Sequence, residues 1–400
     1  MPAPAPATGA RQSTLRASNL ALVVRTVCAS ARPLSRADIA AATSMTRATA
    51  SRLVDELVAG GVLGEIERGG GAAARRGRPA TPLVPGSGLA AAGLQINAGF
   101  LAVRVIDLRG RVVAEALEYG DFVGSDPAAV FGRLAALSTR VLGGLPPGVR
   151  LVGAGLALPG IVAAEGDLLL RAPNLGWSDV EPAALLGTAT PAGLPLHIDN
   201  EANLAARTAA EAAPGRPGAF GDFVYLSGEI GIGGAAVLGG QVMTGRHGWA
   251  GEIGHVCVDP AGPSCRCGST GCLETYAGRD AMLAAAGLTP ASTLAELAEL
   301  AGSGDARARE ALSVTARALA VALAGVINVL DIPTVVLGGH LAQLADLLRP
   351  EVEQQLRTRV LSARWVPPRI EAATSPPAPG ATGAAFRELS GVLADPAAWL

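Results

Sequence analysis

The first 66 residues carry apolar positions at helical spacing, interrupted by two short polar stretches. A first helix is predicted by four residues that share one face: Leu20, Val23, Val24 and Val27. Pro33 ends this helix, and Ser35 can cap a second one that has Asp38 in its first turn. A third helix is expected over residues 46–59, with Gly60 as its stop. The pattern therefore predicts a compact unit of three helices.

The outer face of the third helix combines small and basic side chains, namely Arg47, Ala48, Ser51 and Arg52. Small residues let a helix enter the major groove of DNA, and arginines reach guanine edges or phosphates. Residues 62–66 begin a strand, and Gly69–Gly71 can turn that strand into a wing. Together these features predict a winged helix-turn-helix, with Arg47, Ser51 and Arg52 as DNA contacts. The alternative is a three-helix bundle with an arginine-rich solvated surface.

An arginine cluster, Arg75-Arg76-Gly77-Arg78-Pro79, follows the expected wing. Arginines on an extended Gly/Pro backbone suit the narrow minor groove of A·T-rich DNA. Arg75, Arg76 and Arg78 are therefore further candidates for DNA contact, and a flexible charged linker is the alternative. Aromatic residues are scarce, which disfavours stacking on single strands or RNA loops.

Charge is distributed unevenly along the 400 residues. Residues 1–80 hold 11 arginines against 5 acids, a net charge of +6, so residues 81–400 hold 21 arginines against 29 acids, a net charge of −8. A basic head on an acidic body indicates contact with nucleic acid at one end. With 50% hydrophobic and 16% charged residues the chain is too apolar for a disordered protein, and its length predicts two or three domains.

The sequence predicts neither a membrane span nor a signal peptide. The longest apolar stretch, Ala318–Leu330, is shorter than the roughly 20 residues that a span requires. Residues 1–10 lack the charged and apolar regions of a signal peptide. We therefore expect a cytoplasmic protein that does not contact a membrane.

Strand patterns replace helical ones after the basic head. The first set is a pair of strands over Gly93–Val105 and Val112–Tyr119 joined at Arg109-Gly110, a helix over 127–142 and a strand over 151–158. The second set is strands over 223–227 and 234–238, helices between 279 and 330, a strand over 334–337 and a further helix. Because the same order occurs twice, the sequence predicts two similar α/β lobes with a cleft between them.

Four of the five cysteines lie close together in the sequence. A full tetrahedral set for a structural zinc is available from His255, Cys265, Cys267 and Cys272. Cysteines this crowded in a cytosolic protein more often bind metal than form disulfides. Cys257 lies two residues after His255 and would point the same way along a strand, so it is an alternative fourth ligand. Reduced, unliganded thiols are the other alternative.

Carboxylates and amides accompany this cluster. Glu252 and Glu274 flank it, and Asp199-Asn200-Glu201-Ala202-Asn203 lies upstream. Such groups suit a ligand rich in hydroxyls, since each acceptor can take a sugar O–H. Taken singly, each also fits a solvated surface group, and Asp199 or Asn200 fits a helix cap.

Two stretches carry a resemblance to a known family: Gly248-Trp-Ala-Gly-Glu-Ile-Gly-His255 and Cys265-Arg-Cys-Gly-Ser-Thr-Gly-Cys-Leu-Glu274. Together with the helix-turn-helix they resemble the repressor branch of the ROK family (repressors, open reading frames and kinases). The resemblance covers about residues 14–389. It implies a winged helix-turn-helix domain with its linker over residues 1–82. It further implies a two-lobed, actin-like (ribonuclease H-like) sugar-kinase fold over residues 83–400, divided near residue 200.

The resemblance also implies the residues of the sites. Zinc would be held by the histidine and the three cysteines named above, with Cys257 as a bystander. The implied sugar contacts are Asn174, Asn200, Glu201, Glu252, His255 and Glu274, joined by Gly160.

Departures from the kinase pattern bear on activity. ROK kinases open with a phosphate-binding Asp-x-Gly-Gly-Thr, where this chain has Gln95-Ile96-Asn97-Ala98-Gly99. Their second phosphate loop, Gly-Thr-Gly-x-Gly, is Glu229-Ile230-Gly231-Ile232-Gly233 here, so a carboxylate would repel ATP. Glu201 replaces the aspartate base and could still accept a hydroxyl proton. The sequence therefore favours a non-enzyme with a degenerate nucleotide site.

The combined hypothesis is a sugar-responsive repressor of carbohydrate-metabolism genes that binds double-stranded operator DNA as a homodimer or a dimer of dimers. Two-fold symmetry would then predict palindromic half-sites about 10 bp, or a multiple, apart. The rival class is an ATP-dependent sugar kinase of the ROK family with an added DNA-binding domain. A DNA-binding protein whose body serves only to dimerise is the third class.

Overall fold

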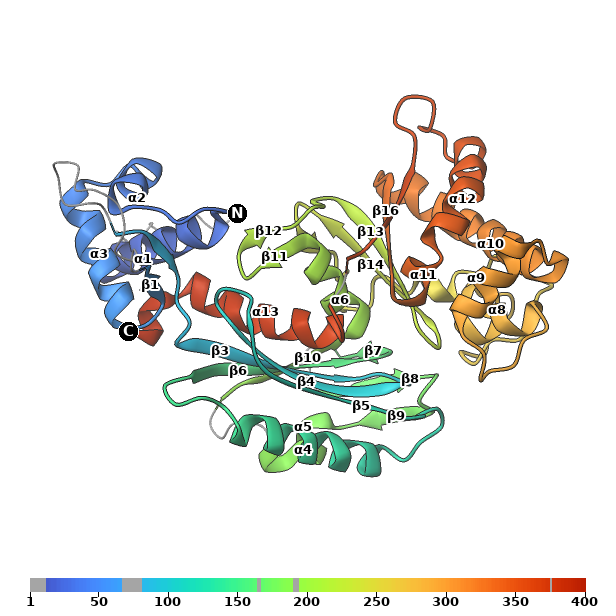
Figure 1. The fold of residues 1–400 in the computed structure, drawn as a ribbon, viewed down its shortest axis with the longest axis horizontal. Helices are drawn as coiled ribbons and strands as arrows, with labels where there is room; N and C mark the ends of the chain where they lie inside the picture. Colours follow the sequence, from blue (N-terminus) through green and yellow to red (C-terminus); the bar gives the residue numbers. More distant parts are fainter. Residues whose placement is uncertain (1–11, 67–80, 164–166, 190–193, 375) are drawn as a thin grey trace, which may run out of the picture.

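The computed structural model describes residues 12–66, 81–163, 167–189, 194–374 and 376–400. Along the described chain a helical head is followed by two α/β lobes, and the last long helix returns from the second lobe toward the head (Figure 1).

The head contains the three expected helices, α1 (Gln12–Ala29), α2 (Arg36–Thr43) and α3 (Arg47–Ala59). Ser35 caps α2 as predicted, because its hydroxyl accepts from the Asp38 amide while the Asp38 carboxylate accepts from the Ser35 amide. Two short strands, β1 (Leu63–Glu65) and β2 (Leu83–Pro85), pair antiparallel after α3. This confirms a winged helix-turn-helix. The expected turn at Gly69–Gly71 lies outside the described residues.

The first lobe is built on a five-stranded sheet with the order β10-β6-β3-β4-β5. Its strands are β3 (Leu89–Ile96), β4 (Phe100–Asp107), β5 (Val112–Tyr119), β6 (Arg150–Leu158) and β10 (Leu196–Asn200). One face is covered by α4 (Pro127–Gly143) and α5 (Pro182–Leu186) (Figure 1). The connection from β6 to β10 also contains β7 (Ile161–Val162), β8 (Leu169–Ala172), β9 (Trp177–Val180) and the 3-10 turn η1 (Gly187–Ala189).

One predicted strand of this lobe is wrong. The stretch Gly93–Val105 forms parts of two antiparallel strands instead of one. The chain reverses at Asn97, whose amide donates to the Phe100 carbonyl and whose side-chain oxygen accepts from the Gly99 amide at 2.9 Å. An asparagine that bonds the backbone two residues ahead in this way stabilises a turn.

The second lobe repeats the first. Its sheet has the order β15-β14-β13-β16-β17. In both sheets the first three strands along the chain pair antiparallel, and the last two join them in parallel. The strands are β13 (Phe223–Gly228), β14 (Ile232–Leu238), β15 (Gln241–Val242), β16 (Thr334–Gly338) and β17 (Arg369–Ala372). Between β10 and β13 the chain forms α6 (Glu201–Ala210) and the small hairpin of β11 (Glu211–Ala213) and β12 (Arg216–Pro217). The predicted pair of similar α/β lobes is therefore confirmed.

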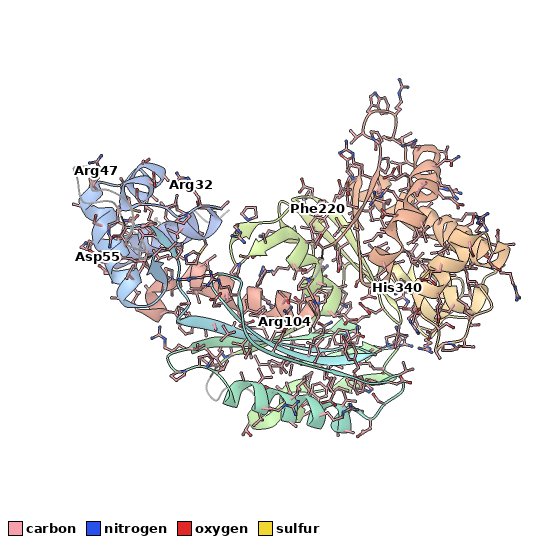
Figure 2. The ribbon with its side chains drawn as sticks, in the orientation of Figure 1. Arg32, Arg47, Asp55, Arg104, Phe220 and His340 are labelled. Atoms are coloured by element: carbon pink, nitrogen blue, oxygen red, sulfur yellow. The ribbon has the colours of Figure 1, made fainter. Side chains whose placement is uncertain are left out.

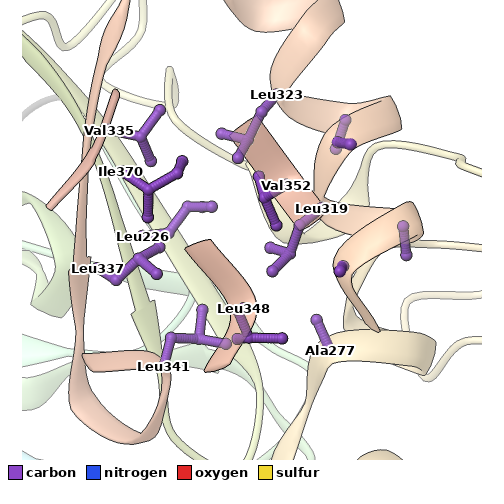
Figure 3. Close-up of a cluster of buried hydrophobic side chains, with 14 of the residues drawn as sticks. Leu226, Ala277, Leu319, Leu323, Val335, Leu337, Leu341, Leu348, Val352 and Ile370 are labelled. Atoms are coloured by element: carbon purple, nitrogen blue, oxygen red, sulfur yellow. The ribbon is translucent and has the colours of Figure 1, made fainter. Parts of the chain in front are cut away.

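Helices of the second lobe pack on its sheet through a continuous apolar core (Figure 3). They are α7 (Glu274–Ala277), α8 (Arg279–Ala285), α9 (Leu294–Ser303), α10 (Ala306–Leu330), α11 (Gly339–Gln343) and α12 (Ala345–Arg359). In the described chain only α10 is long and apolar enough to cross a membrane. Its Leu319 and Leu323 are buried against Val352 of α12 and the strands, which is the packing of a core helix.

The last long helix, α13 (Pro379–Ala394), lies on the sheet of the first lobe, and the 3-10 turn η3 (Pro396–Trp399) ends the chain beside the head (Figure 1). Backbone packs directly on backbone here, because a Cβ at Gly93 would overlap the Ala381 carbonyl and one at Gly383 would overlap the Leu204 carbonyl. The far end of α13 shares a hydrophobic cluster with the head: Phe386, Leu389 and Val392 pack with Leu20, Val24 and Leu57. Head and first lobe therefore have a common core.

Candidate functional site

A cavity of about 160 Å³ lies between the two lobes, where β6 and β10 end and where β13 turns into β14. A cavity of about 150 Å³ holds a six-membered ring such as benzene, so this space fits one sugar ring. Every residue expected to contact a sugar lines it: Asn174, Asn200, Glu201, Glu252, His255 and Glu274, with Gly160. Residues spread over a hundred positions of sequence therefore converge on one polar cavity.

Asn200 joins two elements at the edge of this cavity. It is the N-cap of α6, since its side-chain oxygen accepts from the Ala202 amide at 2.7 Å and the Asn203 amide at 3.3 Å. Its side-chain nitrogen donates to the Gly160 carbonyl at 2.8 Å. The interpretation of Asn200 as a helix cap is confirmed, and the cap fixes the first turn of α6, which carries Glu201, against the turn after β6.

Glu201 points into the cavity from the first turn of α6 and is held by two amides. Its Oε2 accepts from Gln95 Nε2 at 3.2 Å and from Asn97 Nδ2 at 3.0 Å. Burial raises the pKa of Glu201, while the two hydrogen bonds act in the opposite direction. The end of β3 and the turn at Asn97 thus each present one amide donor to this carboxylate.

Glu274 anchors the opposite wall of the cavity. Its Oε2 accepts from the Ile232 amide at 3.0 Å and from Asn174 Nδ2 at 3.3 Å. Glu252 lies beside it, and burial raises the pKa of Glu252, with His255 lowering it and Glu274 raising it further. Asn174 also accepts from Arg266 at 3.3 Å. The side chains of Glu274, Glu252 and Asn174 therefore give this wall several oxygens that can accept hydrogen bonds from hydroxyl groups.

Glu229 also lines the cavity, although it is absent from the sugar contacts that the sequence predicts. It follows the end of β13, in the turn toward β14. Burial, reinforced by repulsion from Glu201, raises the pKa of Glu229 to about 7. The signal that could have identified it is its place in the stretch that corresponds to the kinases' second phosphate loop, which here lines the cavity.

The four predicted metal ligands lie together beside the cavity. The ligand atoms of His255, Cys265, Cys267 and Cys272 are all within 4.8 Å of one another. Cys265 Sγ is 3.8 Å from His255 Nδ1, and the sulfurs of Cys267 and Cys272 are 3.7 Å apart. A tetrahedral site with metal–sulfur bonds of about 2.3 Å has edges of about 3.8 Å, so these residues fit a metal ion.

His255 faces both the metal ligands and the cavity. Its Nδ1 is directed at Cys265, whereas its Nε2 lies 3.9 Å from Glu252 Oε2. Burial raises the pKa of the Cys272 thiol to about 12, so the positive charge of a metal is needed to hold it as a thiolate. A metal here would fix the imidazole that the cavity wall uses.

Cys257 lies outside this group. The strand expected to align it with His255 is wrong, because a 3-10 turn, η2 (Ile253–His255), stands in its place. The Cys257 backbone instead forms an isolated bridge with Cys272, and its side chain is exposed. The cluster is therefore complete without Cys257.

The outer face of α3 presents part of the predicted DNA-contacting set. Arg47 begins the helix and is exposed, pointing away from the head (Figure 2), and Ser51 is half-buried. Arg52 is exposed and paired with Glu56 at 3.0 Å. Arg75, Arg76 and Arg78 lie outside the described residues.

Comparison with known proteins identifies the two parts of the chain. An IclR helix-turn-helix domain model matches residues 18–65. The ROK family model matches residues 147–387, which is more than half of the chain. The chain belongs to the ROK family.

Relatives within the ROK family include both regulators and kinases. The xylose repressor of Caldicellulosiruptor bescii is 26% identical over 89% of this chain and 92% of its own length. A glucokinase of Halalkalibacterium halodurans is 31% identical over 56% of this chain and 72% of its own length. The crystal structure of a ROK family transcriptional regulator, a homologue of the E. coli Mlc protein, superposes with a TM-score of 0.73. It covers 95% of this chain and 98% of its own at 23% identity, and so supports the fold.

Proposed function

We propose that this chain is a sugar-responsive DNA-binding transcriptional regulator, a repressor of carbohydrate-metabolism genes. The observation that carries the proposal is the hydrophobic cluster shared by the helix-turn-helix and α13, because it builds a DNA-reading head directly onto a lobe with a ring-sized polar cavity. Similarity to a xylose repressor over 89% of this chain supports it. The head and its linker would occupy residues 1–82, and the two-lobed sugar-binding domain residues 83–400. Such a regulator acts in the cytoplasm, beside the DNA.

The head would read operator DNA through α3, with Arg47, Ser51 and Arg52 in the major groove. The acids at the other end of this helix are paired with arginines other than the proposed DNA contacts, since Asp55 pairs with Arg36 at 2.6 Å and Glu56 with Arg16 at 2.5 Å. Their negative charge is thereby kept from repelling phosphates. Arg75, Arg76 and Arg78 would enter the neighbouring minor groove, and a homodimer would present two heads to a palindrome.

A sugar would bind through Asn174, Asn200, Glu201, Glu252, His255 and Glu274. The route from this cavity to the head is α13. Its first turn is tied to the cavity because the Ala381 amide donates to Gln95 Oε1 at 3.0 Å, and Gln95 in turn donates to Glu201. Its last turns lie in the cluster shared with the head. A ligand that binds one position of α13 better than another shifts the head between DNA-competent and incompetent states.

Zinc is the metal that best suits one histidine and three cysteines. When bound, it would supply structural rigidity to the loop that carries His255, with no open position for catalysis. Sugar response should therefore depend on zinc more strongly than folding of the head does.

A ROK sugar kinase is the second candidate, because a glucokinase is 31% identical over 56% of this chain. Two features argue against phosphoryl transfer. Gln95 and Asn97 stand where the kinases have their first phosphate loop, and both amides are engaged by Glu201. Glu229 adds a carboxylate where the second loop would bind phosphate. The nucleotide site is degenerate in this interpretation.

A single set of measurements tests the proposal. Operator sequences selected from random duplexes by the full-length protein provide the DNA, and fluorescence anisotropy measures its affinity in the presence of each of a panel of pentoses and hexoses. We expect at least one sugar to change the affinity about tenfold or more. ADP release with ATP and the same panel should stay at background. Turnover at ordinary kinase rates, or an operator affinity that no sugar changes, would contradict the proposal.

A further inference from the structure

The cavity between the lobes is lined by four carboxylates: Glu201, Glu229, Glu252 and Glu274. Among the described residues, the cationic or potentially cationic side chains that line it are Arg171 and His255. Arg171 is exposed and donates to the Cys267 carbonyl at 3.1 Å, and His255 belongs to the predicted metal ligands. The interior of the cavity is therefore rich in carboxyl groups and poor in cationic side chains that could offset their charge.

Glu229 stands where this cavity meets a wider interlobe space of about 830 Å³, and it lines both. Its carboxylate lies against the start of α11, because a Cβ at Gly339 would come within 2.7 Å of Glu229 Oε1. Glu201 is close enough to repel it. Within the described chain, no hydrogen bond or ion pair engages the Glu229 carboxylate. A ligand group at this boundary therefore meets a carboxylate that the protein leaves unpaired.

The basic groups on the far side of the boundary are already engaged. Arg279 pairs with Asp280 at 2.9 Å and donates to the carbonyls of Pro290 and Ser292. His340 is buried, its Nε2 lies 3.0 Å from the Ala277 carbonyl, and burial lowers its pKa to about 4, so it is neutral at physiological pH. Neither group offers a free positive charge to an anion beside Glu229.

We propose that the cavity selects an unphosphorylated sugar over the phosphate ester of the same sugar, and that Glu229 is the residue that sets this selectivity. The inference rests on the proposed sugar response and names the chemical class of its effector. Above its pKa of about 7, the Glu229 carboxylate is ionised and accepts from a hydroxyl group, whereas it repels a phosphate group, which carries about −1.5 to −2 charges near pH 7. The regulator would thus respond to a sugar before an ATP-dependent kinase converts it.

Paired ligands test the selectivity on the full-length, zinc-loaded protein. Isothermal titration is carried out at pH 8, above the pKa of Glu229, with glucose, mannose, xylose and N-acetylglucosamine, each beside its terminal phosphate ester. We expect the free form of the sugar that binds to have an affinity at least about 100-fold higher than its ester. In Glu229→Gln, which keeps the shape and removes the charge, this ratio should shrink about tenfold or more. Glu299→Gln, an exposed position on α9, is the matched control and should leave the ratio unchanged.

The outcomes separate this inference from the proposed function. An ester that binds the wild-type protein as tightly as the free sugar overturns the selectivity while the sugar response stands. A wild-type ratio that Glu229→Gln leaves unchanged overturns the role of Glu229. If no free sugar and no ester of the panel binds, the sugar response fails, and the selectivity fails with it. The comparison in the wild-type protein does not depend on how well any variant folds.

Discussion

Arg387 of α13 donates to Asp199 at the end of β10, with Arg387 Nη1 and Asp199 Oδ2 3.0 Å apart. The other oxygen of Asp199 accepts from the Asn200 amide at 2.7 Å and from Asn203 Nδ2 at 3.2 Å. One carboxylate therefore links the start of α6, where Asn200 and Glu201 face the cavity, to the helix that reaches the head. This link lies midway along α13, beyond its contact with Gln95 and within the turns that share a hydrophobic cluster with the head.

Arg387→Gln should uncouple the cavity from the head. Both side chains of the pair are partly exposed, so we expect the free energy of unfolding to fall by about 1 kcal/mol or less. The sugar-dependent change in operator affinity should shrink about 2- to 30-fold, because the variant loosens an element that both sites share. Fluorescence anisotropy with and without sugar measures the change, and calorimetry checks that sugar still binds.

The matched control for this variant is Arg317→Gln. Arg317 forms an ion pair with Glu310 at 2.7 Å on the surface of α10, away from α13. It should leave the sugar-dependent change in operator affinity as it is. Equal coupling in Arg387→Gln and the wild-type protein would show that the signal does not pass through this pair.

The zinc content of cysteine variants should distinguish Cys272, which belongs to the metal cluster, from Cys257, which lies outside it. We expect about one zinc per chain in the wild-type protein and in Cys257→Ser, and a loss of most of it in Cys272→Ser, because a three-ligand set leaves the structural site open. Mass spectrometry of the metal measures this directly. Zinc retained in Cys272→Ser but lost in Cys257→Ser would mean that the ligand set is wrongly assigned.

Chelation tests what the metal does. Removing zinc should reduce the sugar-dependent change in operator affinity, because the loop that carries His255 loses its anchor. Operator binding without sugar should change less, since the head lies in a separate hydrophobic cluster from the second lobe. Normal sugar response in the chelated protein would contradict the anchoring role.

Local signals made much of the fold predictable. The cap at Ser35 and the apolar face of α3 are encoded within a few residues, so the head could be recognised from the sequence. The break between β3 and β4 was missed because Ile96 and Leu101 are both buried, and the turn depends on a side-chain bond made by Asn97. The path of α13 could not be predicted either, since its glycine contacts join Gly93 to Ala381 across nearly three hundred residues.

The cavity shows the same difference between local signals, which can be recognised in the sequence, and long-range contacts, which cannot. The residues expected to bind sugar were located by motif, and the structure brings them together. From the sequence, Glu229 could be assigned only to the position of a kinase phosphate loop, because its burial beside Glu201 depends on how the two lobes meet. Long-range electrostatics of this kind leave no periodic pattern in a sequence.

Arg47→Ala should weaken operator binding about 10- to 100-fold, because Arg47 is exposed at the start of α3, the helix that we propose to read the DNA. Arg25→Ala removes the same charge from an exposed position on α1 of the same head and serves as the control. Its effect should be small and should diminish with added salt. Similar losses in both variants would indicate that the head binds DNA by charge alone.

Glu229 should make the stability of the protein depend on pH even without a ligand. Its pKa is about 7 in the folded protein, against an ordinary value of 4.5. Between these values the folded state holds more protons than the unfolded one, so the free energy of unfolding falls as pH rises through about 7. Glu229→Gln removes the free-energy cost of ionising this buried carboxyl group. Relative to the wild-type protein, it should be more stable by about 1–3 kcal/mol near pH 8 and about equal near pH 4. Urea unfolding at both pH values measures the difference, with Glu299→Gln as the exposed control. A gain in stability that is the same at both pH values would contradict the raised pKa of the buried Glu229 carboxyl group.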